Sequence, residues 1–395
     1  AGGGWQALVE PRVTMEMLVR AVLPLGLIPE VVPEFRRITV GGSIQGIAGE
    51  STSFDKGFFH DSCDSYEIVL GDGTVVLADA TNDYSDLFLA LPGTYGTLGI
   101  LTAATVRLQR ATPYVAMQYL PFKLLGTMMK YITAALNSDD FADTPVDFLE
   151  GFGYAPDKFL IAQGRFVSEE DALSGEFGPV QKYSKWWSPW FYRRARKRQG
   201  KVDVIPTEDY LFRHDRGSFW MASYKMPQIV GRSLGFALSS HRMYKMASAL
   251  PAVFDKSEIL LQDFMIPAGN VEAFVDTLED SLGVWPLWFC PLRNLRKKGV
   301  IFGVPANGGH FCNVGAYGIP RKVKFDFERD NKLMEMAMLE NGGRKVHYSH
   351  AYYPQDLFYG RIYDGEYYAE LRARYEAEDA FPHVHEKVVT KGNKL

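Results

Sequence analysis

The sequence predicts an α+β fold built on antiparallel sheets. Residues 67–77 form two β-rich runs around Gly71-Asp72-Gly73, which is a strong signal for a hairpin turn. A second hairpin is predicted at residues 147–167, around Ala155-Pro156-Asp157. Residues 270–282 have instead the pattern of a helix. Hairpin-connected strands pair antiparallel, and helices placed between such runs indicate the α+β class.

Local signals place the remaining elements. Thr14 is a good N-cap for a helix over residues 15–25, and Asn270 for the helix that ends before Gly283. Further strands are predicted at residues 5–13, 114–122, 253–266 and 300–316, and further helices at residues 82–90, 124–136, 325–339, 355–358 and 365–375.

Composition indicates a globular protein with a full core. The chain has 395 residues, which is room for two or three domains. Hydrophobic residues make up 47% and charged residues 23%. Aromatic residues make up 14%, which suits either a large apolar pocket or simply a bulky core. The net charge of −4 provides no basic field for nucleic acid.

The cysteines and histidines do not form a metal or disulfide pattern. Cys63, Cys290 and Cys312 are odd in number and widely spaced, so we expect buried, reduced thiols. His383 and His385 lie near the end of the chain without further ligand-type spacing, so no metal site is predicted.

Glycines concentrate in two stretches, residues 38–51 and 96–100. Glycine lets another group approach the backbone closely, so these stretches suit a backbone that wraps a ligand. Ordinary turns in a loop-rich β-region explain the same pattern. The dinucleotide fingerprint G-x-G-x-x-G at the start of a helix is absent from both.

The order of these segments resembles the flavin-binding domain of the vanillyl-alcohol oxidase superfamily. Short phrases along nearly the whole chain also resemble the delta-24 sterol reductase (Diminuto/Dwarf1-like) family. They lie at residues 70–73, 85–88, 96–100, 148–151, 189–191, 285–291, 315–318 and 380–382. The resemblance implies a flavoprotein with FAD that reduces a side-chain double bond of a sterol, with NADPH as electron donor. The predicted partner is thus a sterol or another apolar small molecule.

The resemblance also implies which residues contact FAD through the backbone. They are Thr39, Val40, Gly41, Gly42, Gly46, Gly49, Ser51, Gly96, Gly99 and Ile100. At Gly42 and Gly99 we expect that a β-carbon would occupy space that the cofactor needs.

Three regions follow from the resemblance. Residues 1–112 correspond to the second half of an FAD-binding domain that lacks its N-terminal part. Residues 113–370 correspond to a cap domain, an antiparallel sheet with helices on one face, and residues 371–395 return to the first domain. The family's first pyrophosphate-binding loop has no counterpart in the sequence. We therefore expect FAD to bind only if an upstream segment, on this chain or another, completes the site.

Reduction of an isolated double bond needs a proton donor in a dry pocket. On matching family phrases the candidates are Glu150, His214 and Tyr317. Each has a simpler interpretation: an ion pair with an arginine for Glu150, a surface position for His214, and packing for Tyr317. Arg213, Arg216 and Arg321 are candidates to hold a phosphate or carboxylate, or to form structural ion pairs. His60 is a candidate flavin attachment point or base, or an ordinary loop histidine.

Residues 181–201 place aromatic side chains before a basic cluster. This composition suits an anchor at an anionic membrane surface, a contact with a protein partner, or a solvated helix end. The segment from 17 to 32 is too interrupted by prolines and charges to span a bilayer. Family resemblance implies an intracellular, membrane-associated protein at the endoplasmic reticulum or another organelle membrane.

Two functions of different class remain. One is an FAD-dependent sterol reductase, favoured by Gly41, Gly42, Gly96 and Gly99. The other is a non-catalytic relative that serves as an accessory subunit of a larger complex, favoured by the aromatic and basic segment.

Overall fold

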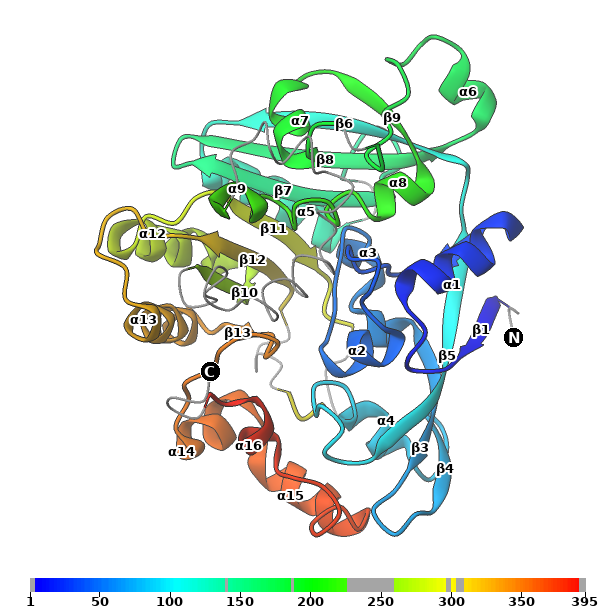
Figure 1. Ribbon diagram of the computed structural model, residues 1–395, viewed down its shortest axis with the longest axis vertical. Coiled ribbons are helices and arrows are strands. Elements are labelled where there is room, and N and C mark those ends of the chain that lie inside the picture. Colours follow the sequence, from blue (N-terminus) through cyan, green and yellow to red (C-terminus); the bar gives the residue numbers. More distant parts are fainter. Residues whose placement is uncertain are drawn as a thin grey trace.

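The computed structural model describes residues 4–138, 141–185, 188–225, 259–295, 300–302 and 309–390. Two antiparallel sheets, each with its own helices, dominate the molecule (Figure 1). The chain passes from one sheet to the other between residues 110 and 114. The predicted α+β class is confirmed.

The first sheet has five strands in the order β1-β5-β3-β4, with β2 pairing to β5. Its strands are β1 (Trp5–Val9), β2 (Leu27–Pro29), β3 (Cys63–Val69), β4 (Val75–Asp79) and β5 (Ile100–Arg110). The predicted hairpin joins β3 to β4. Gly73 adopts a φ of 87° in its turn, a conformation that suits glycine.

Short helices accompany this sheet: α1 (Met15–Val22), α2 (Val40–Gln45), α3 (Ser53–Lys56) and α4 (Ser85–Ala90). Thr14 caps α1 as predicted, since its hydroxyl accepts from the Met17 N–H at 3.3 Å. The interpretation of residues 38–51 as a loop-rich β-region is wrong. Thr39 accepts from the Gly42 N–H at 3.1 Å and so starts a helix despite the glycines that follow.

The second sheet has eight strands in the order β13-β10-β12-β11-β7-β8-β6-β9, and all its pairings are antiparallel. The strands are β6 (Tyr114–Phe122), β7 (Phe148–Ala155), β8 (Lys158–Val167), β9 (Val202–Pro206), β10 (Leu260–Pro267), β11 (Leu287–Leu292), β12 (Phe311–Gly318) and β13 (Arg344–Lys345). The predicted hairpin at 147–167 is confirmed as β7–β8. Part of the strand predicted at 253–266 lies outside the described residues.

The main helices of this region are α5 (Leu125–Asn137), α12 (Val271–Ser281) and α13 (Phe327–Glu340), which pack side by side. Asn270 occupies the N-cap position of α12 as predicted, but its side chain makes no capping bond and its amide donates to the Asn341 carbonyl at 3.0 Å.

Helices cover both faces of the second sheet rather than one. On β7, a β-carbon at Gly151 would point to Met128 of α5 at 3.4 Å, whereas the neighbouring Phe152 packs on Phe191 of α7 (Phe191–Lys197). Successive strand residues face opposite sides, so α5 and α7 lie on opposite faces. Shorter helices are α6 (Glu169–Leu173), α8 (Thr207–Leu211) and α9 (Ala222–Lys225).

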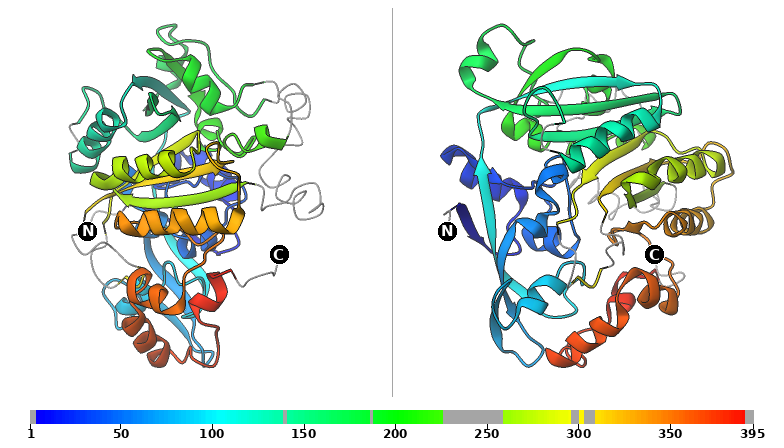
Figure 2. Two further views of the ribbon diagram at one scale, coloured as in Figure 1. Left: turned by 90° about the vertical axis from the view of Figure 1, so that its left-hand side faces the viewer. Right: turned by 180° about the vertical axis from the view of Figure 1, so that it is seen from behind.

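The C-terminal region packs against the first sheet. It comprises α14 (Gln355–Leu357), a π-helical turn (Phe358–Ile362), α15 (Gly365–Arg374) and α16 (Val384–Val388). Arg372 donates to the Thr97 carbonyl at 2.7 Å, and Arg374 pairs with Asp86. Both views in Figure 2 show these helices, orange to red, beside the cyan strands of the first sheet.

The three cysteines are free and buried, as predicted. Within the described part of the chain, every helix is too short or too polar to cross a membrane.

Candidate active site

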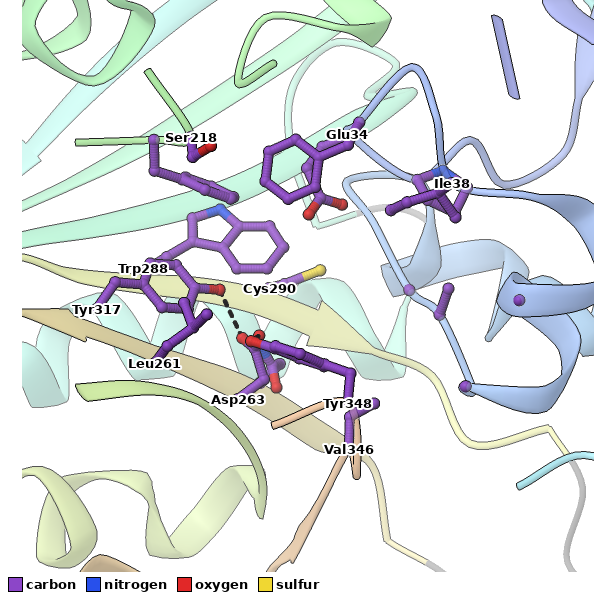
Figure 3. Close-up of a pocket in the computed structure, with 18 of the residues that line it drawn as sticks. Glu34, Ile38, Ser218, Leu261, Asp263, Trp288, Cys290, Tyr317, Val346 and Tyr348 are labelled. Carbon is purple, nitrogen blue, oxygen red and sulfur yellow. Dashed lines mark hydrogen bonds between the residues drawn. The ribbon is translucent and has the colours of Figure 1, made fainter. Parts of the chain in front are cut away.

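A cavity of about 480 Å³ lies between the two parts of the fold. On the side of the first part it is lined by residues of the segment that leads into and through α2. On the other side it is lined by β10, β11 and β12 of the second sheet. Figure 3 shows Glu34 and Ile38 entering from the first side, with Asp263, Trp288, Cys290 and Tyr317 on the strands opposite. The cavity walls are mainly apolar, which is typical of small-molecule sites.

One wall of the cavity, called the glycine wall below, carries only small side chains. It is formed by Thr39, Gly42, Gly46, Ala48 and Gly49. A β-carbon would lie 3.0 Å from the Thr39 hydroxyl if added at Gly42, 2.8 Å from the Gly42 carbonyl at Gly46, and 2.5 Å from Leu292 at Gly49. Close packing within the protein therefore excludes larger side chains at these three positions, and the wall presents only small groups to the cavity, which suits a flat ring system such as that of a flavin.

The other predicted cofactor contacts do not line this cavity. Val40, Gly41, Ser51, Gly96, Gly99 and Ile100 all lie elsewhere. The steric reason given for Gly99 is wrong, because a β-carbon there would meet Ile68 at 2.5 Å and the Val69 carbonyl at 3.1 Å. Gly99 thus allows β5 to approach β3, and Ile100 is 55% exposed.

Tyr317 is the predicted proton donor that the structure brings to the cavity. Its hydroxyl donates to Asp263 at 2.7 Å, and Asn313 donates to the same oxygen at 2.6 Å. Tyr348 donates to the other carboxylate oxygen (Figure 3). Burial raises the pKa of Asp263 despite these three donors, and burial beside Asp263 raises the pKa of Tyr317 well above its ordinary value.

Glu34 is a second cavity carboxyl, which the sequence analysis did not single out. Burial and then the nearby charge of Glu50 raise its pKa to about 8. Its carboxyl group has no side-chain hydrogen-bond or ion-pair partner among the described residues. The sequence offers no distinctive signal for Glu34, since Glu30 and Arg36 are charged residues close by.

Glu150 and His214 lie together behind the cavity wall. Arg213 donates to Glu150 at 2.7 Å and to Glu50 at 2.6 Å, and His214 Nε2 lies 2.9 Å from Glu150. Trp288 lines the cavity with its ring and donates its indole N–H to Glu150 at 2.8 Å. The arginine pair predicted as the simpler interpretation of Glu150 is present, whereas His214 is buried rather than at the surface.

The two carboxyl groups of this buried cluster differ, since burial raises the pKa of Glu50 despite Arg213. Burial alone would raise the pKa of Glu150, but Arg213 and His214 lower it to about 2. Burial lowers the pKa of His214 to about 4, so at neutral pH it is uncharged and Glu150 is ionised. Glu50, Glu150 and His214 are close enough together to suggest metal ligands. The guanidinium of Arg213, bonded to both carboxylates, already supplies the positive charge there.

The loop after Arg213 is strained where it meets the cavity. Ser218 and Phe219 have φ values of 43° and 61°, which side chains other than glycine rarely adopt. Phe219 stacks on His214 with ring centres 4.0 Å apart and lines the cavity. The buried cluster therefore shapes the cavity through Phe219 and Trp288.

The remaining arginine candidates for anion binding donate to backbone carbonyls of the protein. Arg216 donates to the carbonyls of Tyr183 and Ser188, and Arg321 donates to the Trp285 carbonyl at 3.1 Å. His60 is buried and lines a separate cavity of about 40 Å³.

The basic segment near α7 is partly internal. Phe191 and Tyr192 are buried, and Arg194 and Arg198 both pair with the buried Asp203 at 2.9 Å. Trp186 and Trp187 lie outside the described residues. Among the described residues of 181–201, the exposed cations are Lys182 and Lys185 before α7, and Arg196, Lys197 and Lys201 at its end and beyond.

Comparison with known proteins agrees with this architecture. Residues 2–79 match the FAD binding domain family. Together with the glycine wall and the eight-stranded second sheet, which forms the cap (the cap sheet), this match defines an FAD-dependent oxidoreductase. The chain is 31% identical to the Delta(24)-sterol reductase of Arabidopsis thaliana, across 98% of this chain and 74% of the relative. The corresponding values are 32%, 98% and 73% for the Pisum sativum protein, and 28%, 96% and 73% for the human one. The chain belongs to the delta(24)-sterol reductase family.

Proposed function

We propose that this protein reduces a carbon–carbon double bond in the side chain of a sterol, with electrons that NADPH delivers through FAD. The observation that carries the proposal is the apolar cavity of about 480 Å³ between the glycine wall and the cap sheet. Cavities of roughly 300–1,000 Å³ suit small-molecule ligands. The names of the relatives support a sterol as the substrate.

Thr39, Gly42, Gly46 and Gly49 are the residues that would hold the ring system of FAD. Reduced FAD, when bound, supplies a hydride. The apolar residues opposite, including Leu261, exclude water and leave room for the substrate's hydrocarbon. No NADPH motif is recognisable in the sequence, which suits transient docking of the nicotinamide.

The cavity geometry separates the three predicted proton donors. Glu150 is ionised and holds no proton to give, and His214 is directed to Glu150. Their contacts act instead on Trp288 and Phe219, which form part of the cavity wall. Tyr317 and the neighbouring Asp263 remain as groups that can orient a substrate or pass a proton within the cavity.

We also propose that the protein meets its sterol at a membrane surface, at the endoplasmic reticulum or another organelle. Sterols partition into bilayers, so a peripheral contact would shorten the path of the substrate. The exposed basic residues Arg196, Lys197 and Lys201, at the end of α7 and just after it, supply a charge of the sign that anionic lipids attract.

The test is an anaerobic assay on the full chain incubated with FAD. NADPH should bleach the flavin absorbance, and a sterol with a double bond at position 24 should restore it. The saturated sterol is the control and should leave the flavin reduced. Mass spectrometry should find a product heavier by two hydrogens. A well-folded protein that stays colourless after incubation with FAD would favour the accessory-subunit function instead.

A further inference from the structure

Glu34 lines the cavity without a charged side-chain partner among the described residues. It belongs to the segment between β2 and α2 and projects into the cavity towards β11, the strand that carries Trp288 and Cys290 (Figure 3). Apolar side chains, among them Phe35 and Phe219, accompany it on the wall. Glu34 is half-buried, and a carboxyl group placed among apolar side chains is a functional candidate, because removing it from water without a charged partner costs free energy.

The charged groups around Glu34 disfavour its ionised form. Glu50 lies behind the wall and Asp263 across the cavity, and both repel a further negative charge. Arg213 acts in the opposite direction but is already bonded to two carboxylates. Arg37 lines the rim and is exposed, so water screens its charge. Glu34 is therefore a neutral acid at neutral pH.

The other cavity acids are less suited to give a proton. Tyr317 is a phenol whose pKa is raised further by burial, whereas carboxyl groups start about 6 pKa units lower. Asp263 accepts three hydrogen bonds, so its oxygens are engaged as acceptors. Among the described residues no side chain donates to Glu34, whereas three donate to Asp263, and such a contrast between two carboxyl groups separates acid and base roles in enzymes.

We propose that Glu34 is the proton donor of the reduction, an inference that rests on the function proposed above. One carbon of the double bond receives the hydride with its electron pair. The other receives the proton from Glu34, whose O–H bond breaks to leave a carboxylate. Solvent then returns a proton to Glu34 before the next cycle. Both new C–H bonds and both electrons are thereby accounted for.

The first experiment needs no substrate. Infrared difference spectra of the purified full chain, recorded across a pH titration, should contain a protonated-carboxyl band that persists at pH 7 and disappears around pH 8. Glu34→Gln should lack the band. The matched control Glu30→Gln should retain it, because Glu30 lies outside the cavity and pairs with Arg107 at 3.1 Å. A wild-type spectrum without such a band at pH 7 would overturn the proposal.

The second experiment separates the proton step from the function itself. In Glu34→Gln, reduction of the bound flavin by dithionite should be unchanged, while its reoxidation by the sterol should slow by about 10²–10⁴-fold, the usual contribution of a general acid. Glu34→Asp should recover part of the rate and serves if the Gln variant folds poorly. Equal sterol rates in wild type and Glu34→Gln would refute the role of Glu34 and leave the proposed function standing. A wild type that never reduces the sterol would refute the proposed function, and with it Glu34 as its proton donor.

Discussion

Arg213 donates from Nη2 to Glu50 at 2.6 Å, and this buried contact joins the two parts of the fold. Glu50 follows α2 in the first part, whereas Arg213 follows α8 in the cap. The same guanidinium also holds Glu150 on β7. The cavity lies beside this junction, so the guanidinium of Arg213 connects the segment of the glycine wall to the cap sheet.

We expect Arg213→Met to destabilise the protein by about 3–5 kcal/mol, because it leaves two buried carboxylates without their cation. Denaturant unfolding at pH 7 measures this. Arg20→Met is the control: Arg20 is 59% exposed in its pair with Glu16, and such pairs contribute about 0–1 kcal/mol. Similar losses in the two variants would contradict a structural role for the buried cluster.

Gly42→Val protein that still folds should bind FAD poorly, since the added side chain would crowd Thr39 in the glycine wall, where a β-carbon lies 3.0 Å from the Thr39 hydroxyl. Visible absorbance after incubation with FAD and gel filtration measures the bound flavin. Gly269→Val is the matched control, because a β-carbon at Gly269 has nothing within 4 Å. Gly99→Val is unsuitable as a test, since it would clash with β3 and reduce folding itself. Full flavin content in folded Gly42→Val would show that the ring system lies elsewhere.

His214 should make the protein sensitive to mild acid. Its pKa falls from about 6.5 in the unfolded chain to about 4 in the native state, chiefly through burial. Between these values the unfolded chain binds the proton and the native state does not, so stability decreases as pH falls. From pH 7 to 4.5 we expect wild type to lose about 2–3 kcal/mol more than His214→Gln. Parallel curves of unfolding free energy against pH would contradict this.

Local signals were sufficient to predict much of the fold. The Thr14 cap and the turn at Gly73 act over a few residues, and both are found where the sequence indicates them. The helix α2 was missed because Gly41 and Gly42 lower helix propensity, whereas the capping hydroxyl of Thr39 and tertiary packing favour it.

The cavity acids could not be predicted in the same way. Glu34 and Asp263 line the same cavity only because the fold places the segment before α2 opposite β10. The neutral state of Glu34 depends on burial and on charges brought from other elements. Tyr317 was placed on its family phrase, but its bond to Asp263 is a tertiary contact between β12 and β10.

The basic segment contains both cations that pair with a buried carboxylate and cations that are exposed. Replacing all of its arginines would confuse two effects, because Arg194 and Arg198 neutralise the buried Asp203. The variant to use is therefore Arg196→Glu with Lys197→Glu and Lys201→Glu, which changes exposed charges alone.

If this segment contacts a membrane, wild type should bind vesicles that contain phosphatidylserine and not vesicles of phosphatidylcholine alone. Each exposed cation contributes about 1 kcal/mol near an anionic surface, so the triple variant should lose roughly 100-fold or more in affinity. Added salt should weaken wild-type binding, because it screens the attraction. Lys130→Glu, on the exposed side of α5, is a control for net charge. Vesicle binding that survives the triple change, or that is absent in wild type, would exclude this surface as the membrane contact.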